Sequence, residues 1–231
     1  MTTDAALPPQ REPWLTIPIA LVLAMTALII VLHGLTYLLN EKEWVRLHFD
    51  FALAPQRFFA PPDSEIAYPN LVSKLMTLVS TALLHGDWMH VVLNALMMWQ
   101  FGAPLARVLG PGVAGAGKWM LLFVVSVAAG SLVYLLLKGA GGGAAVGASG
   151  GVCGLVAADF LAGSDGRMRS PLSREFLMLT LYFAIVNLLL VFVIPLVLPF
   201  YVAWEAHLGG YLAGMAMMLI LGPKARTAEA A

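Results

Sequence analysis

Two short motifs in this sequence carry side chains that can do chemistry together. Ser149 lies in Gly147-Ala-Ser149-Gly150, and His207 lies in Ala206-His207-Leu-Gly-Gly. A serine hydroxyl is a poor nucleophile until a base takes its proton, and neutral histidine suits that task near neutral pH. The pair therefore predicts nucleophilic acyl transfer, with Ser149 as the nucleophile and His207 as the general base.

A second polar pair is predicted to stabilise the oxyanion of such a reaction. His90 and Asn94 are four residues apart, so they share one face of a helix. The oxyanion of a tetrahedral intermediate requires preorganised hydrogen-bond donors. The amide of Asn94, a ring N–H of His90 and the backbone N–H of Ser149 can supply them. Asp87, just before this helix, is predicted to be its N-cap.

The sequence offers no obvious carboxylate as a third catalytic member. Glu205 is two residues from His207, which is about 200° around a helix axis. Asp159 lies roughly 15 Å farther along its helix than Ser149. We therefore predict a Ser-His dyad, with the roles of both carboxylates unassigned.

The composition indicates where this chemistry takes place. Of 231 residues, 60% are hydrophobic and 11% are charged, with a formal net charge of zero, whereas soluble domains carry about 25% charged residues. This favours a polytopic membrane protein and argues against a nucleic-acid partner. The single cysteine, Cys153, excludes an internal disulfide and any multi-cysteine metal site. His85 is predicted to be structural, and His33 and His48 to have no role.

The apolar segments predict an all-α fold with six transmembrane helices. A helix that crosses a hydrocarbon core about 30 Å thick needs about 20 apolar residues. The predicted spans are Leu15–Leu39, Trp88–Ala106, Trp119–Leu137, Ser149–Gly163, Phe176–Ile194 and Tyr201–Leu221. Residues 15–221 thus form one membrane domain, between short cytoplasmic tails at residues 1–14 and 222–231.

The basic residues predict the orientation of the chain. With the N-terminus inside, more lysine and arginine falls on the inner side than on the outer side, as the positive-inside rule requires. Both termini are therefore expected in the cytoplasm and the active site towards the outer side of a bacterial-type plasma membrane. The long first outer loop, residues 40–87, mixes aromatic and charged residues, which is typical of an amphipathic insertion in the membrane interface.

Small residues are predicted to bring the serine and the histidine together. Half of residues 139–154 are glycine, so this loop can bend sharply and approach other backbone closely. A helix that starts at Ser149 would present its free N–H groups to a developing negative charge. Small-residue stripes run from Ser149 along its helix and from Ala203 through His207 to Gly214. Such faces let membrane helices pack with their backbones nearly touching.

These features resemble the rhomboid family of intramembrane serine proteases. The matching pieces are Ala82-Leu-Leu-His85 followed by His90-x-x-x-Asn94, and the two motifs around Ser149 and His207. The resemblance implies the same nucleophile, base and oxyanion hole. It also implies cleavage of transmembrane segments of single-span membrane proteins, without a metal or organic cofactor. The fifth span and the Pro195–Phe200 loop would then be the moving gate and cap.

The sequence departs from the family pattern at two points. Members commonly carry an aromatic residue four positions after the serine, packing against the base, where this chain has Cys153. The Trp-Arg pair often found in the first outer loop is absent, unless Trp44-Val-Arg46 is a displaced version. The first departure concerns how His207 is positioned, and the second concerns how the loop is anchored.

Two other functions remain as alternatives. A catalytically silent relative that binds membrane clients could dispense with the serine or the histidine, and both are present here. A small transporter would use polar residues at the bilayer midplane and would usually show internal repeats. The polar cluster predicted here lies off-centre, and no repeat is evident.

Overall fold

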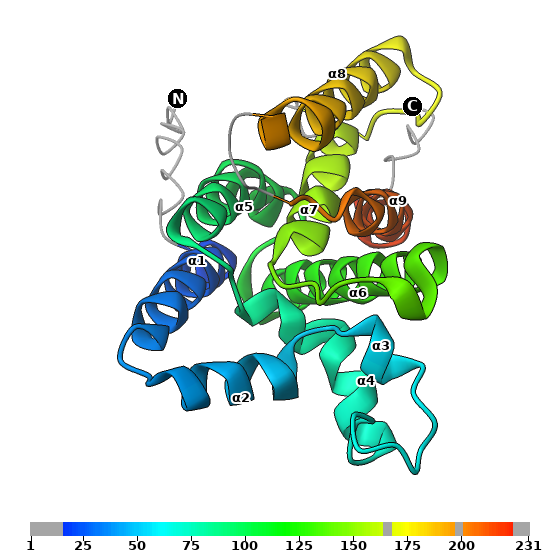
Figure 1. The fold of residues 1–231 in the computed structure, drawn as a ribbon. Coiled ribbons are helices and arrows are strands. Elements are labelled where there is room, and N and C mark those ends of the chain that lie inside the picture. The colour runs from blue at the N-terminus through cyan, green and yellow to red at the C-terminus, as the bar shows by residue number, and fades with distance from the viewer. Residues whose placement is uncertain (1–15, 164–167, 197–200, 224–231) are drawn as a thin grey trace, which may run out of the picture.

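The computed structural model describes residues 16–163, 168–196 and 201–223, and this part of the chain is helical without a strand (Figure 1). The larger helices are α1 (Ile17–Thr36), α5 (Trp88–Val108), α6 (Gly112–Lys138), α7 (Ser149–Ala162), α8 (Arg174–Phe192) and α9 (Trp204–Leu221). The all-α prediction is therefore confirmed. The predicted N-terminal tail, most of the C-terminal tail and residues 197–200 of the predicted cap lie outside the described residues.

Each predicted span corresponds to one of these six helices, but the helices are not equal as membrane spans. Within the described ranges, α1, α5, α6 and α8 are long and apolar enough to cross a membrane. Helix α7 has 14 residues, fewer than the roughly 20 that a full crossing needs, and α9 with its 18 residues is not among the four. Helix α6 begins at Gly112 rather than at Trp119. Lys118 therefore lies within the helix, where its long side chain can carry the charge to the surface.

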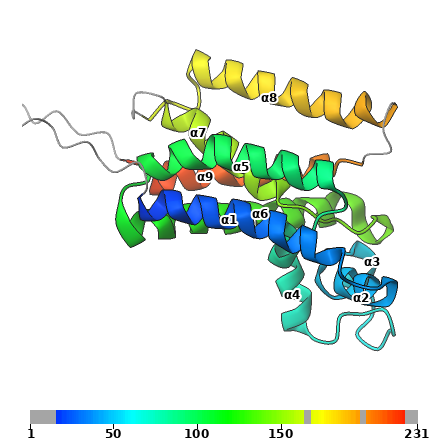
Figure 2. The ribbon, with the colours of Figure 1, turned by 90° about the vertical axis from the view of Figure 1, so that its left-hand side faces the viewer.

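The long first outer loop is built from short helices. They are α2 (Glu41–Phe51), α3 (Pro55–Phe58), α4 (Leu71–Ser80) and the 3₁₀ turn η1 (Thr81–Leu83). Figure 2 shows α2 and α3 next to the end of α1, and α4 projecting away from the bundle below α1 and α6. Helix α2 starts with a capping box between Asn40 and Glu43, and none of its residues is buried. Its exposed aromatic side chains fit the predicted interfacial insertion.

A buried arginine anchors this loop. The Arg57 side chain donates to the backbone carbonyls of Phe49, Ile66 and Ala67, and its guanidinium lies over the rings of Phe49 and Tyr68. Arg57 is 6% exposed. Trp44 and Arg46 are exposed residues of α2, so the anchor is not the displaced Trp-Arg pair that the sequence suggested.

Glycines set the distances between the central helices. Helix α7 lies in the middle of the bundle, with α5, α6, α8 and α9 around it (Figure 1). A β-carbon added to Gly210 of α9 would overlap the carbonyl oxygen of Gly150, and one added to Gly214 would overlap that of Gly154. The backbones of α7 and α9 therefore touch, as the small-residue stripes predict.

Glu205, which the sequence left unassigned, joins the ends of two helices. Its side chain is 2% exposed, and its Oε1 lies 2.8 Å from Nζ of Lys138. Lys138 is the last residue of α6, and Glu205 is in the first turn of α9. Each charge thus lies at the helix end whose dipole stabilises it. The ion pair holds the start of α9 against the end of α6, next to the loop that leads to Ser149.

We predict that Gly210→Ala destabilises the fold and separates the two helices. The added methyl has no space against the Gly150 carbonyl, and overpacking of this kind costs about 1–3 kcal/mol. The melting temperature in detergent should fall. Gly117→Ala is the matched control, because a β-carbon at Gly117 meets no atom within 4 Å and alanine favours a helix over glycine. A native melting temperature for Gly210→Ala would contradict the tight-packing interpretation.

Candidate active site

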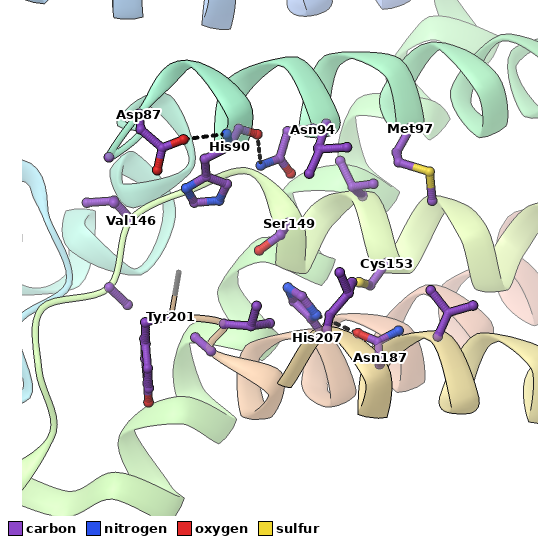
Figure 3. Close-up of a pocket in the computed structure, with 18 of the residues that line it drawn as sticks. Asp87, His90, Asn94, Met97, Val146, Ser149, Cys153, Asn187, Tyr201 and His207 are labelled. Carbon is purple, nitrogen blue, oxygen red and sulfur yellow. Dashed lines mark hydrogen bonds between the residues drawn. The ribbon is translucent and has the colours of Figure 1, made fainter. Parts of the chain in front are cut away.

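A cavity of about 320 Å³ opens between α5, α7, α8 and the start of α9. Its wall includes all four predicted site residues, His90, Asn94, Ser149 and His207. Figure 3 shows the hydroxyl of Ser149 pointing into the cavity, with the imidazole of His207 on one side of it and His90 and Asn94 on the α5 side. The structure therefore brings together four residues that are up to 117 positions apart in the sequence, from His90 to His207 (207 − 90).

Ser149 is the first residue of α7. The chain turns into this helix at Gly147, whose φ of +120° disfavours residues with a side chain. A β-carbon there would also lie 2.6 Å from ring atoms of His90. The first N–H groups of α7 have no acceptor within the helix, so a negative charge beside Ser149 would be stabilised there.

The first outer loop holds the glycine-rich loop in place. Leu53 and Ala145 exchange backbone hydrogen bonds of 3.1 and 2.8 Å. The Thr81 hydroxyl donates to the Ala145 carbonyl at 2.6 Å, and the Thr81 carbonyl accepts from the N–H of Gly147 at 2.9 Å. On the other side, the Tyr134 hydroxyl donates to the Gly143 carbonyl at 2.9 Å. Peptide groups that a loop exposes at membrane depth are thereby satisfied within the protein.

Helix α5 supplies the predicted oxyanion donors. Asp87 Oδ1 accepts the backbone N–H of His90 at 2.8 Å, which confirms Asp87 as the N-cap. Asn94 Nδ2 donates to the carbonyl of His90 at 3.0 Å. An amide carries two N–H groups, so this bond fixes the orientation of Asn94 and leaves its second N–H for a ligand. Among the described residues that line the cavity, Asp87 is the one with a carboxylate, and it serves as the N-cap of α5.

Asn187 of α8 is a polar residue of the site that the sequence analysis missed. Its Oδ1 lies 2.6 Å from Nδ1 of His207 (Figure 3), and its Nδ2 donates to the carbonyl of Phe183 at 2.9 Å. A signal for it was present, because an amide in the middle of an apolar span is costly and needs a partner.

His85 and His33 lie behind the site and do not line the cavity. The His85 ring is 5.1 Å from the ring of His90 and 6.4 Å from that of His33, measured between centroids. Burial, and to a smaller extent the charges of His90 and His33, lowers the pKa of His85 to about 3, so its ring is neutral at physiological pH. The structural role predicted for His85 fits this position. His33 is also buried, packed between Tyr37 and Trp88, so it contributes to packing where no role was predicted.

A second, apolar cavity of about 460 Å³ lies between α8 and α9. It shares Phe183, Asn187 and His207 with the first cavity. Helix α8 therefore has open space on both sides at the level of the histidine.

The fold and the site define a helical membrane protein with a serine, a histidine and amide donors around one cavity. The sequence model of the rhomboid domain matches residues 72–224, more than half of the chain. RHOMBOID-like protein 5 of Arabidopsis thaliana is 33% identical over 155 residues, which make up 64% of this chain and 45% of that protein. The chain belongs to the rhomboid family. It spans less than half the length of this curated relative.

We predict that Cys153→Ala retains most of the activity of the site, whatever its substrate. Cys153 is buried one turn after Ser149 and lines the same cavity, and a buried thiol is usually inert. The measurement is turnover of wild type and Cys153→Ala at equal folded concentration. Loss of activity in a variant with native melting would assign the thiol a role beyond packing.

Proposed function

We propose that this protein is an intramembrane serine endopeptidase that cleaves transmembrane segments of single-span membrane proteins. The observation that carries the proposal is the placement of Ser149 and His207 in the cavity that His90 and Asn94 also line. Membership of the rhomboid family supports the same activity.

In the proposed reaction, the lone pair of His207 Nε2 takes the hydroxyl proton of Ser149 while Oγ attacks the scissile carbonyl carbon. The resulting oxyanion is stabilised by the free N–H of Asn94, the His90 ring and the N–H groups at the start of α7. The tetrahedral intermediate collapses, the C–N bond breaks, and the imidazolium gives its proton to the leaving amine. Water then attacks the acyl-enzyme by the same route, with His207 again as the base.

The proposal includes the environment of the site. The chain lies in the bilayer with both termini cytoplasmic and the cavity open to the outer side, in a bacterial-type plasma membrane. The bias of basic residues towards the inner segments supports this orientation. The two alternatives, a silent client-binding relative and a small transporter, predict no proteolysis that depends on Ser149.

We predict that Ser149→Ala and His207→Ala each abolish cleavage of a tagged single-span protein in detergent or liposomes. A covalent serine reagent should label wild type and fail on both variants. Ser170→Ala is the control, because Ser170 is an exposed residue between α7 and α8 and does not line the cavity. Equal proteolysis by wild type and Ser149→Ala would end the proposal.

We predict that Asn94→Ala lowers kcat with little change in KM, because an oxyanion donor acts mainly in the transition state. Losing one such donor costs about 10²–10³ in rate, and His90 and the α7 N–H groups can reduce this loss. The melting temperature should be measured beside kcat, since Asn94 is also buried and bonded to its own helix. Native melting with native kcat would remove Asn94 from the oxyanion hole.

A further inference from the structure

Helix α8 meets the helix of the catalytic base along one narrow face. Thr180, Phe183 and Asn187 are three and four residues apart, so they lie on the same side of α8. The Thr180 hydroxyl is 2.7 Å from the hydroxyl of Tyr211, and the Phe183 ring stacks on the Tyr211 ring at 4.6 Å between centroids. Asn187 completes the row through its 2.6 Å contact with His207, one turn before Tyr211.

The hydrogen bonds of Asn187 determine which nitrogen of His207 carries the proton. The carbonyl of Phe183 can only accept, so the amide nitrogen of Asn187 must face it. The amide oxygen then faces His207 and can also only accept, which requires a proton on Nδ1. Exchanging the two ends of the amide would bring two acceptor oxygens together at Phe183. The neutral ring therefore has its lone pair on Nε2.

That tautomer is the one a base for Ser149 needs. With Nδ1 bonded to Asn187 on α8, the ring turns its other edge into the cavity, where Figure 3 shows the Ser149 hydroxyl. The bond also matters after proton transfer, because the acceptor at Nδ1 stabilises the imidazolium. In hydrolases with a carboxylate at this place, a change that leaves the ring in the wrong tautomer lowers kcat about 10⁴-fold.

Asn187 is suited to holding the Nδ1 proton of His207, and attachment of α8 to the bundle does not explain why an asparagine stands at this position. Of the residues of α8, all of which are described, only Phe176 is fully buried. The apolar face of α8 could hold the helix with leucine at position 187, and the back-bond to Phe183 adds nothing between helices. An amide in a lipid-facing helix is costly unless its polar atoms form hydrogen bonds. The atom of Asn187 that forms a hydrogen bond between helices is its Oδ1, which contacts Nδ1 of His207.

We propose that Asn187 is a positioning residue that fixes His207 as the general base, so that the machinery is a Ser149–His207–Asn187 triad drawn from α7, α9 and α8. This inference rests on the proposed protease function. A consequence is that the base is held in its reactive form only where α8 lies against α9.

The test compares variants at Asn187 with one at Thr180. Asn187→Leu keeps the size of the side chain and removes the acceptor, whereas Asn187→Asp keeps an acceptor oxygen for the Nδ1 proton. Thr180→Val removes the other polar contact between α8 and α9 and leaves the base untouched. Cleavage of a tagged single-span protein gives kcat and KM, and melting temperatures report stability.

We expect Asn187→Leu to lower kcat about 10²-fold, within the range that general-base catalysis contributes, with KM nearly unchanged. Asn187→Asp should retain most of kcat, and Thr180→Val should melt earlier than wild type with nearly native kcat. Equal losses of kcat in Asn187→Leu and Thr180→Val, with no rescue by aspartate, would assign Asn187 to anchoring and overturn the proposal. So would native kcat in Asn187→Leu.

A spectroscopic readout keeps this question separate from the protease function. In protein with nitrogen-15 histidine, the His207 signals, assigned by their absence in His207→Gln, should report a proton on Nδ1 in wild type. In Asn187→Leu the two tautomers should be mixed. The same measurement on Ser149→Ala should match wild type. If Ser149→Ala still cleaves substrate, the protease proposal fails. If Nδ1 is unprotonated in wild type at neutral pH, the role of Asn187 is refuted and the protease proposal still stands.

Discussion

The active-site geometry depends on the contact between the backbones of α7 and α9. Ser149 and His207 belong to different helices, and they meet because Gly150, Gly210 and their neighbours leave no side chain between those helices. Within a bilayer, apolar side chains gain little free energy by moving from lipid to protein. Close backbone packing and hydrogen bonds therefore drive the association of the helices. A methyl group added at Gly210 would lower the stability of the fold and increase the distance between Ser149 and His207, because both depend on the contact between Gly210 and Gly150.

Several polar interactions in this molecule support the loop that precedes Ser149. The Lys138–Glu205 pair, the Arg57 cluster and the bonds from Leu53 and Thr81 all lie around the segment that leads into Ser149. Unsatisfied peptide groups are too costly at membrane depth, so a sharply bent glycine loop needs such support. The long outer loop therefore supports the site indirectly, by holding the loop that precedes Ser149.

The sequence predicted those parts of the structure that depend on local pattern. The six helices, the Asp87 cap, the close α7–α9 packing and the gathering of His90, Asn94, Ser149 and His207 all follow from apolar runs, spacing and small residues. Arg57, Glu205 and Asn187 were missed or left unassigned because each acts through a partner far away in the chain. A charge or amide in an apolar segment signals that a partner exists, but spacing alone does not identify it. The early start of α6 was not predicted, because Lys118 interrupts the apolar run directly before Trp119.

The two halves of the site differ in how firmly they are held, and this difference bears on catalysis. Helices α7 and α9 are locked by glycine contacts, whereas α8 is mostly exposed and has open space on both sides. A peptide can react only if it reaches Ser149 together with water. The cavity of about 320 Å³ has room for several water molecules, or for a short extended segment together with water. In the proposed mechanism α8 is the moving gate, and its movement would widen the cavity without disturbing the α7–α9 contact. His207 depends on both parts of the site. Its backbone belongs to α9, which is packed tightly against α7, and the acceptor for its Nδ1 proton belongs to α8.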